Sequence, residues 1–336
     1  MAYNFDKIKL EKGMYHEAGM SFTQVLEKAD PSENYVNTPY EGLDAYQRQL
    51  KRFGIKVKGA GSDIVEKFFR TSQSSVLFPE YVARSVKAGM EEGNVLPSIT
   101  ASVTKIDGMD YRSIFSTSGE DGVSLRRVEE GAEIPATEIK VQENRVLLHK
   151  RGRMLVASYE AIRFQRLDLF SVMLREIGGH IMRSHLEDAI DVLINGDGNG
   201  NAADAVSGGG SLTYDTLLQF WSRFDPYTMN TILVSPATML KLLRLTEFQN
   251  PLTGLNFQGT GELTNPLGAK LIKTTAMADD KMIGLDRGYA LEMVQASDLN
   301  VEYDRLIDRQ LERAAITSIT GFAKIYEGAS KVLEIA

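Results

Sequence analysis

The chain has 336 residues, of which 43% are hydrophobic and 25% charged, and its formal net charge is −7. This composition fits a globular protein of about two domains and excludes collagen, a coiled-coil rod and a fully disordered chain. The acidic balance argues against a protein that coats nucleic acid over its whole surface, and the absence of cysteine excludes disulfides, Cys-ligated zinc, iron–sulfur clusters and thiol catalysis.

The N-terminal 75 residues have the pattern of an arm with short helices. Ser21 and Gln24 form a capping-box pattern, and the helix that they open should end before Pro31. A second helix is indicated by one apolar face, and Gly54 can end it. Since these helices are short, we expect the arm to lie on another surface and to build no large core alone. The residues of the apolar face are Leu43, Tyr46, Leu50 and Phe53.

A clear helix opens at Pro79, carries an apolar stripe of Val82, Val86 and Met90, and can end at Gly93. The Gly-, Ser- and acid-rich stretch that follows predicts a long β-hairpin within 102–135. Its expected strands are Tyr111–Phe115 and Val123–Val128, and its expected tip is Gly119–Gly122.

A period of two residues from Val141 to Val156 predicts a long strand or strand pair that is apolar inside and basic outside. A long helix is predicted next, over residues 169–194, with Gly178-Gly179 inside it. Each glycine costs about 1 kcal/mol relative to alanine, so close packing of another backbone would explain them. The expected buried side of this helix comprises Phe170, Met173, Ile177, Ile181, Ile190 and Leu193.

Glycine-rich turns at 195–200 and 207–210 mark a boundary, after which the pattern becomes α/β. We expect a helix through Leu217, Leu218 and Trp221, a loop at 252–267, and two strands within 314–335 that meet near Glu327-Gly328. Ser235-Pro236 should cap another helix. The remaining predicted strands are Thr231–Val234, Lys270–Lys273 and Met282–Leu285.

No pattern of catalytic, cofactor-binding or metal-binding residues is found. The Asn195–Gly200 segment resembles a calcium loop, but position 12 is Val206 instead of an acid, so a helix cap and turn is the better interpretation. His180 and His185 lie about 140° apart on a helix, so they do not share a face that could bind a metal. Gly59-Ala60-Gly61 is an isolated G-x-G without the third glycine of the dinucleotide-binding motif. No membrane span or export signal is present, so the protein should be soluble and cytoplasmic when made.

Charged clusters are the candidate contact residues. They are either solvated faces or contacts to acidic surfaces of neighbouring subunits or to a polyanion. Arg126-Arg127 followed by Glu129-Glu130 suits pairing between subunits. Two basic clusters are also present: one comprises Arg48, Lys51, Arg52, Lys56 and Lys58, and the other comprises Arg145, Lys150, Arg151 and Arg153. The candidate assembly contacts are Arg126, Arg127, Glu129, Glu130, Arg48, Lys51 and Arg52.

An ordered set of segments resembles a known family. The set comprises Glu130–Pro135, the strands of 145–156, Ser158–Ile162, the Leu193–Gly198 helix ending, Leu233–Pro236, Gly268–Leu271 and Arg309–Arg313. In this order they resemble the major capsid protein of tailed bacteriophages, which has the Hong Kong 97-type fold. The resemblance covers the chain from about Thr71 to its end.

The resemblance implies an α+β fold with six segments. These are an N-terminal arm (1–75) that reaches over a neighbour, the start of a peripheral domain (76–101), an extended hairpin loop (102–130), the peripheral domain with long strands and spine helix (131–210), an axial domain (211–301), and a return to the peripheral domain (302–336). An arm and a hairpin of this kind repay their ordering entropy only in an assembly.

The implied function is a non-enzymatic major capsid protein that assembles as pentamers and hexamers into an icosahedral shell. The shell would enclose phage double-stranded DNA without sequence-specific binding. Scaffolding, portal and decoration proteins are possible partners, the location is the virion, and assembly takes place in the bacterial host cytoplasm. An encapsulin-like shell with protein cargo and a soluble α/β enzyme of small oligomeric state remain alternatives. The identity of the enclosed cargo, DNA or protein, distinguishes a phage capsid from an encapsulin-like shell. A pocket with convergent polar groups would favour the enzyme.

Two further expectations concern maturation. Some family members join the extended loop to a neighbour by a Lys–Asn isopeptide bond, but no lysine lies between Lys105 and Lys140. We therefore expect no cross-link of that type. Because only about 75 residues precede the matching region, we also expect an uncleaved arm.

Overall fold

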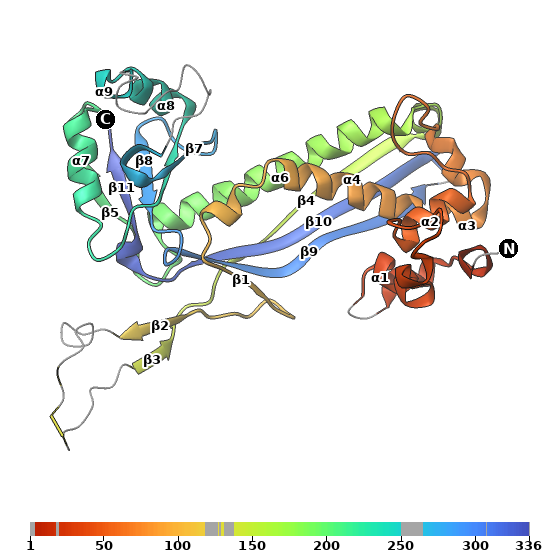
Figure 1. Ribbon diagram of the computed structural model, residues 1–336, viewed down its shortest axis with the longest axis horizontal. Coiled ribbons are helices and arrows are strands. Elements are labelled where there is room, and N and C mark those ends of the chain that lie inside the picture. Colours follow the sequence, from red (N-terminus) through yellow and green to blue (C-terminus); the bar gives the residue numbers. More distant parts are fainter. Residues whose placement is uncertain are drawn as a thin grey trace. The chain divides into compact units, whose positions relative to one another are not determined.

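A computed structural model describes residues 4–17, 20–117, 127, 129–130, 138–249, 265–306 and 308–335 (Figure 1). The chain forms two compact units. Unit 1 comprises Met1–Gly93, Arg151–Met182 and Leu299–Ser318, and unit 2 comprises Asn94–Lys150, Arg183–Asp298 and Ile319–Ala336. Helices and strands are mixed in the chain, as predicted for an α+β fold.

The N-terminal residues of unit 1 fold into a helical cluster with a core of its own. Ser21 and Gln24 form the predicted capping box. Phe5, Leu26 and Leu50 are buried in this small cluster, and the cluster lies against α4, since Arg84 of α4 pairs with Asp44 at 2.7 Å. The Tyr15 hydroxyl donates to the Val76 carbonyl oxygen (2.7 Å) just before α4 and accepts from the Glu80 N–H (3.1 Å) in its first turn. The elements are Asn4–Lys7, Lys12–His16, α1 (Phe22–Ala29), Ser32–Tyr35, α2 (Ala45–Arg52), Val65–Arg70, α3 (Ser72–Ser75) and α4 (Phe78–Glu92).

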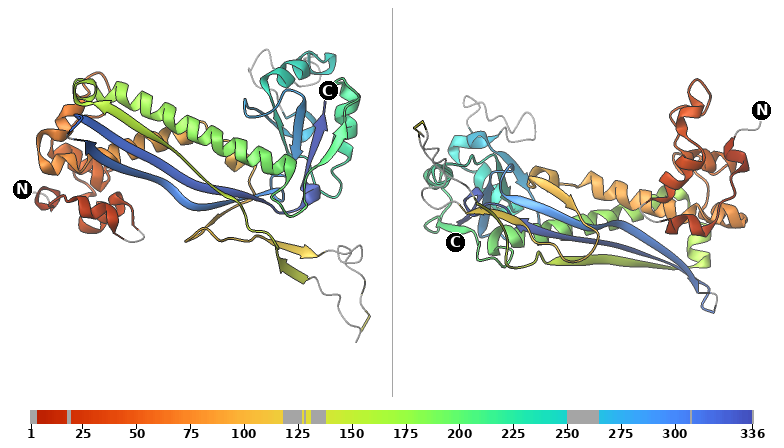
Figure 2. Two further views of the ribbon diagram at one scale, coloured as in Figure 1. Left: turned by 180° about the vertical axis from the view of Figure 1, so that it is seen from behind. Right: turned by 90° about the horizontal axis from the view of Figure 1, so that it is seen from below.

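Helix α6 (Leu167–Asn195) is the predicted long helix, and it packs against α4 inside unit 1 (Figure 2). A methyl group at Gly178 would overlap the Val86 carbonyl oxygen of α4. One at Gly89 of α4 would lie 2.5 Å from the Arg175 carbonyl carbon. The expected backbone approach at Gly178 is therefore confirmed. Met173, expected inside, is exposed, because its neighbour Leu174 takes the inward position.

A four-stranded sheet has the order β1–β9–β10–β4. The period-two strand around residue 150 is present as β4. Its predicted apolar side is confirmed at Val146 and Leu148, which pack in one buried cluster, and is wrong farther along the strand. Met154 and Val156 are exposed, whereas Arg151 and Leu155 are half-buried, because the described helices cover the other side of this edge strand. The strands are β1 (Ser102–Lys105), β4 (Leu148–Ser158), β9 (Leu291–Leu306) and β10 (Leu311–Lys324), and a short helix α5 (Tyr159–Arg163) follows β4.

Unit 2 contains a five-stranded sheet of order β5–β11–β8–β6–β7, in which the predicted strands are confirmed. Residues 302–336 are divided between the two sheets: β10 belongs to the four-stranded sheet, whereas β11 pairs with β5 and β8 in the five-stranded sheet. The predicted 252–267 loop lies mostly outside the described residues. The elements are β5 (Asp204–Ser207), α7 (Tyr214–Ser222), β6 (Thr231–Val234), α8 (Pro236–Leu243), α9 (Thr246–Gln249), Pro266–Gly268, β7 (Lys270–Lys273), β8 (Lys281–Leu285), Glu327–Ala329 and β11 (Ser330–Glu334).

The predicted hairpin exists, but its second strand differs from the expected one. β2 (Ile114–Thr117) pairs antiparallel with β3 (Glu138–Val141), with Ile114 opposite Val141 (Figure 1). The expected tip and all of Val123–Val128 except Arg127 lie outside the described residues. The alternation of residues identifies strands but does not select partners, so the pairing needed the tertiary structure.

Candidate functional site

The β2–β3 ribbon presents an exposed apolar face in unit 2. Ile114, Ile139 and Val141 are 57%, 70% and 59% exposed. The register places Ile114 and Val141 opposite each other, and Ile139 lies two residues from Val141 on the same side. A two-stranded ribbon is at best marginally stable in water, and a contiguous exposed apolar face marks an interaction site. The geometry therefore suits contact with another apolar surface.

The charged candidates near this ribbon are only partly described. Arg127, Glu129 and Glu130 are exposed, and Arg126 lies outside the described residues. In the described part of the chain, no ion pair joins Arg127, Glu129 and Glu130 to one another. Exposed ion pairs contribute about 0–1 kcal/mol each, so such residues could set specificity more than affinity.

The basic cluster predicted around α2 is not one surface. Arg48 is 0% exposed, and its Nε donates to Asp30 Oδ2 at 2.8 Å. Arg52 is half-buried and donates to the Ile8 carbonyl oxygen at 2.6 Å. Lys51 is exposed. Arg48 is therefore unavailable to another subunit, and both arginines stabilise the chain's own N-terminal fold.

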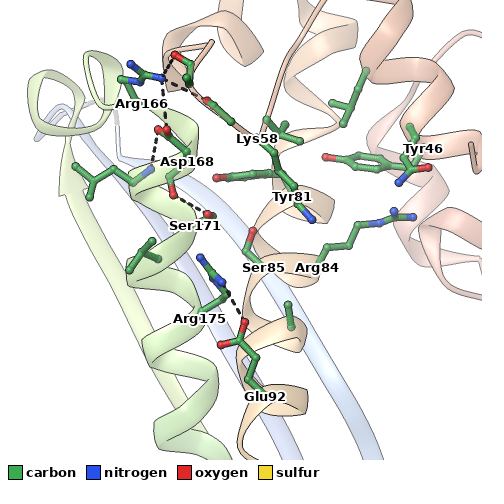
Figure 3. A pocket seen from close by; sticks show the side chains of 18 residues that line it. Tyr46, Lys58, Tyr81, Arg84, Ser85, Glu92, Arg166, Asp168, Ser171 and Arg175 are labelled. Atoms are coloured by element: carbon green, nitrogen blue, oxygen red, sulfur yellow. Dashed lines mark hydrogen bonds and ion pairs between the residues drawn. The ribbon is translucent and has the colours of Figure 1, made fainter. Parts of the chain in front are cut away.

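A groove of about 1080 Å³ in unit 1 was not predicted from the sequence (Figure 3). It lies between α2, residues 57–60, α4 and the first turns of α6. Leu169 and Val172 of α6 line it and are exposed. The other apolar lining residues are Tyr46, Leu50, Val57, Ala60, Tyr81 and Ala88.

Most charges of the groove are paired within it or beside it. Arg175 donates to Glu92 Oε1 at 3.0 Å, and Arg166 donates to the Ala60 carbonyl oxygen at 2.6 Å (Figure 3). A hydrogen bond from Ser62 lowers the pKa of Asp168, and burial raises the pKa of Tyr81. These two pKa shifts favour the ionised carboxylate of Asp168 and the protonated phenol of Tyr81.

The turn after α6 in unit 2 has the predicted cap-and-turn form. Gly196, Gly198 and Gly200 all have positive φ. Asp197 Oδ2 accepts from the Lys324 backbone N–H at 3.0 Å, while the buried Lys324 Nζ donates to the Asn201 carbonyl oxygen at 2.9 Å. Burial lowers the pKa of Lys324 to about 8. The carboxylate of Asp197 thus orders the turn.

The described residues contain no group of three or more His, Cys, Asp or Glu side chains able to hold a metal ion. Within the same residues, no helix is long and apolar enough to cross a membrane.

Sequence reasoning also missed a buried carboxylate in unit 2. Glu292 of β9 accepts hydrogen bonds from Thr104, Tyr111 and Ser113. These partners lie more than 170 residues away along the chain, and hydroxyl residues form no motif. No pattern in the sequence could have found the cluster.

Comparisons with known proteins give one family. A family model described as phage capsid protein matches residues 142–322. No curated protein sequence matches the chain. The matched range contains β4, α6, β9 and most of β10.

Solved structures share the fold. The capsid of a native GTA particle has a TM-score of 0.52 at 16% identity, over 72% of this chain and 89% of that chain. A chain from Mycobacterium phage Che8 has a TM-score of 0.52 at 14% identity, over 68% and 85%. The mature capsid of bacteriophage PhiM1 has a TM-score of 0.51 at 10% identity, over 72% and 86%. The predicted Hong Kong 97-type α+β fold is confirmed.

Proposed function

We propose, since the chain belongs to the phage capsid protein family, that its copies assemble as pentamers and hexamers into an icosahedral shell around phage double-stranded DNA. It is a major capsid protein, a structural component of the virion. The observation that carries the assembly proposal is the exposed apolar face of the β2–β3 ribbon, which one copy leaves uncovered. In an assembly a neighbouring copy covers it, which offsets the entropy of ordering the ribbon.

Two sets of residues are proposed to supply the free energy and the specificity of the contacts between subunits. The apolar face supplies the free energy of contact, at about 25 cal/mol per Å² of apolar surface buried. Lys51, Arg127, Glu129 and Glu130 supply polar rim contacts between subunits, and Arg126 belongs to the same set by its place in the sequence. Arg48 is not retained, because its side chain is buried.

Partners and location follow from the same premise. Scaffolding, portal and decoration proteins are proposed to meet the shell, and synthesis is proposed to take place in the host cytoplasm. The shell holds DNA without reading its sequence and has no catalytic role. A net charge of −7 suits a container that must not bind its genome tightly. Nuclease-protected DNA in purified particles is the expected cargo, and an enclosed enzyme would contradict the proposal.

Ile139→Asp is expected to abolish shell formation, because a carboxylate on the apolar face must lose water when the face is covered. Interface hot spots cost 2 kcal/mol or more, which is about 30-fold in affinity per contact and is repeated at every contact of the shell. Light scattering and negative-stain imaging of purified protein measure the yield of shells.

Lys140→Asp is the matched control, because it places the same carboxylate one residue along β3 on the opposite side of the ribbon. Its shells should form at a yield close to that of the unmodified protein. Shells of Ile139→Asp in normal yield would show that no neighbour covers this face.

Mature particles are expected to dissociate fully into single chains in denaturing electrophoresis. A Lys–Asn isopeptide link from the loop that joins β2 to β3 needs a lysine in that loop, and none lies between Lys105 and Lys140. A ladder of covalent multimers after boiling in detergent would refute this prediction. Mass spectrometry of any upper band would identify the linked residues.

A further inference from the structure

A buried carboxylate of the four-stranded sheet binds the base of the hairpin. Glu292 of β9 is 7% exposed. Its Oε1 accepts from the Thr104 hydroxyl at 2.5 Å and the Tyr111 hydroxyl at 2.7 Å, and its Oε2 accepts from the Ser113 hydroxyl at 2.8 Å. In the described part of the chain Glu292 forms no ion pair, so three neutral hydroxyls hold the carboxylate.

Two of these partners also bind the returning leg of the hairpin. The Tyr111 carbonyl oxygen accepts from the Val146 N–H at 2.9 Å, and the Ser113 carbonyl oxygen accepts from the Gln142 N–H at 2.9 Å. Each residue therefore donates its hydroxyl to Glu292 and accepts a backbone hydrogen bond from the opposite leg. Glu292 therefore connects both legs of the hairpin to β9, beside the hydrogen bond from the Ile106 N–H to the Gln295 carbonyl oxygen.

A buried carboxylate without a cation is costly unless hydrogen bonds satisfy it. An apolar side chain at position 292 would fill the same space without that cost, but it could not orient three hydroxyls. The Glu292 carboxylate only accepts hydrogen bonds, so each of the three hydroxyls must point its hydrogen toward it. The benefit of Glu292 is therefore geometric: it fixes the direction in which the outgoing leg leaves the sheet.

We propose that Glu292 is a positioning residue that sets the direction of the hairpin at residues 106–147, and that shell assembly depends on it. The dependence on assembly rests on the function proposed above. An apolar ribbon meets a neighbouring copy in register only when its base is fixed, because a rotation at the base is magnified at the ribbon.

Hydrogen exchange on unassembled protein tests the positioning role. Glu292→Ala removes all three hydrogen bonds, so the Gln142 and Val146 amides should exchange at least about tenfold faster. Amides of β6 and β8 should keep their rates. Glu292→Gln keeps one acceptor oxygen and should give an intermediate rate and a partial yield of shells.

Glu302→Ala is the matched control, because it truncates an exposed glutamate on the same strand. It should change neither exchange at the hairpin base nor shell yield. Where Glu292→Ala fails to fold, the Tyr111→Phe and Ser113→Ala double variant removes two donors and is expected to raise exchange at the same two amides.

The outcomes separate the two proposals. Faster exchange confined to the hairpin base, with fewer shells, supports the inference. Unchanged exchange at Gln142 and Val146 overturns it, and so does normal shell yield despite faster exchange. Unmodified protein that never forms shells contradicts the proposed function, while the exchange comparison still decides the role of Glu292.

Discussion

Replacing Gly178 by alanine is expected to destabilise the chain by about 3 kcal/mol, at the upper end of overpacking effects. The added methyl group would overlap the Val86 carbonyl oxygen and lie 2.8 Å from the Met90 backbone nitrogen. Both atoms belong to the backbone of α4, which cannot move as a flexible side chain can. The two helices must separate, and the neighbouring core loses contacts. Urea unfolding followed by far-UV circular dichroism measures the change.

Gly179→Ala is the matched control for this prediction. The position is the next residue of α6, and nothing lies within 4 Å of a methyl group there. Alanine has a higher helix propensity by about 1 kcal/mol, so this variant should be as stable as the unmodified protein or more stable. Equal stability of the Gly178 and Gly179 variants would contradict the close approach of α4 and α6.

Arg48→Met is expected to lower the free energy of unfolding by about 3–5 kcal/mol, the cost of leaving one partner of a buried ion pair alone. Arg48 and Asp30 side chains are both 0% exposed. The guanidinium also donates to the Ser32 hydroxyl at 2.9 Å and lies over the Tyr35 ring, 4.3 Å from its centroid. Chemical denaturation measures the loss.

Two variants test whether the charge pair is the cause. Adding Asp30→Asn to Arg48→Met removes the uncompensated charge and should recover part of the stability, because the Tyr35 hydroxyl can still donate to the amide oxygen. Lys51→Met, on the exposed side of α2, should change stability by no more than about 0.5 kcal/mol. A similar loss from Lys51→Met would contradict the role of Arg48.

The Tyr35 hydroxyl belongs to the same buried group. Burial, and the hydrogen bond to Asp30, raise the pKa of Tyr35 to about 12. The phenol therefore stays protonated and keeps donating across the physiological pH range. This arrangement explains how a short N-terminal segment has a defined core.

Helix ends and turns could be predicted because the residues that form them are neighbours in the sequence. The capping residues at Ser21, the proline at Pro79 and the turn glycines after α6 satisfy or break hydrogen bonds of their own neighbourhood. The strand at Thr231–Val234 was predicted to the residue, since a short β-branched run between polar segments has few alternatives. The family resemblance came from the order of such elements.

The errors occurred where a side chain's partner is distant in sequence. The spacing around Arg48 could indicate only a basic face, because Asp30 on another segment is what draws the guanidinium inside. The alternation around Met154 fixed two sides of a strand but not which side the helices cover. Gly178 indicated that another backbone segment packs closely against α6, but only the tertiary structure identified that segment as α4 at Val86.

The sequence by itself determined the longer helices, most strands, the lack of cysteine chemistry and the family, because these depend on residues that are neighbours or on their order along the chain. The tertiary structure alone decided the β2–β3 pairing, the place of β11, the groove beside α6 and the Glu292 cluster. Each of these joins segments whose separation in sequence carries no local signal, so their contacts are selected by the packing of the whole chain and not by the propensities of its parts.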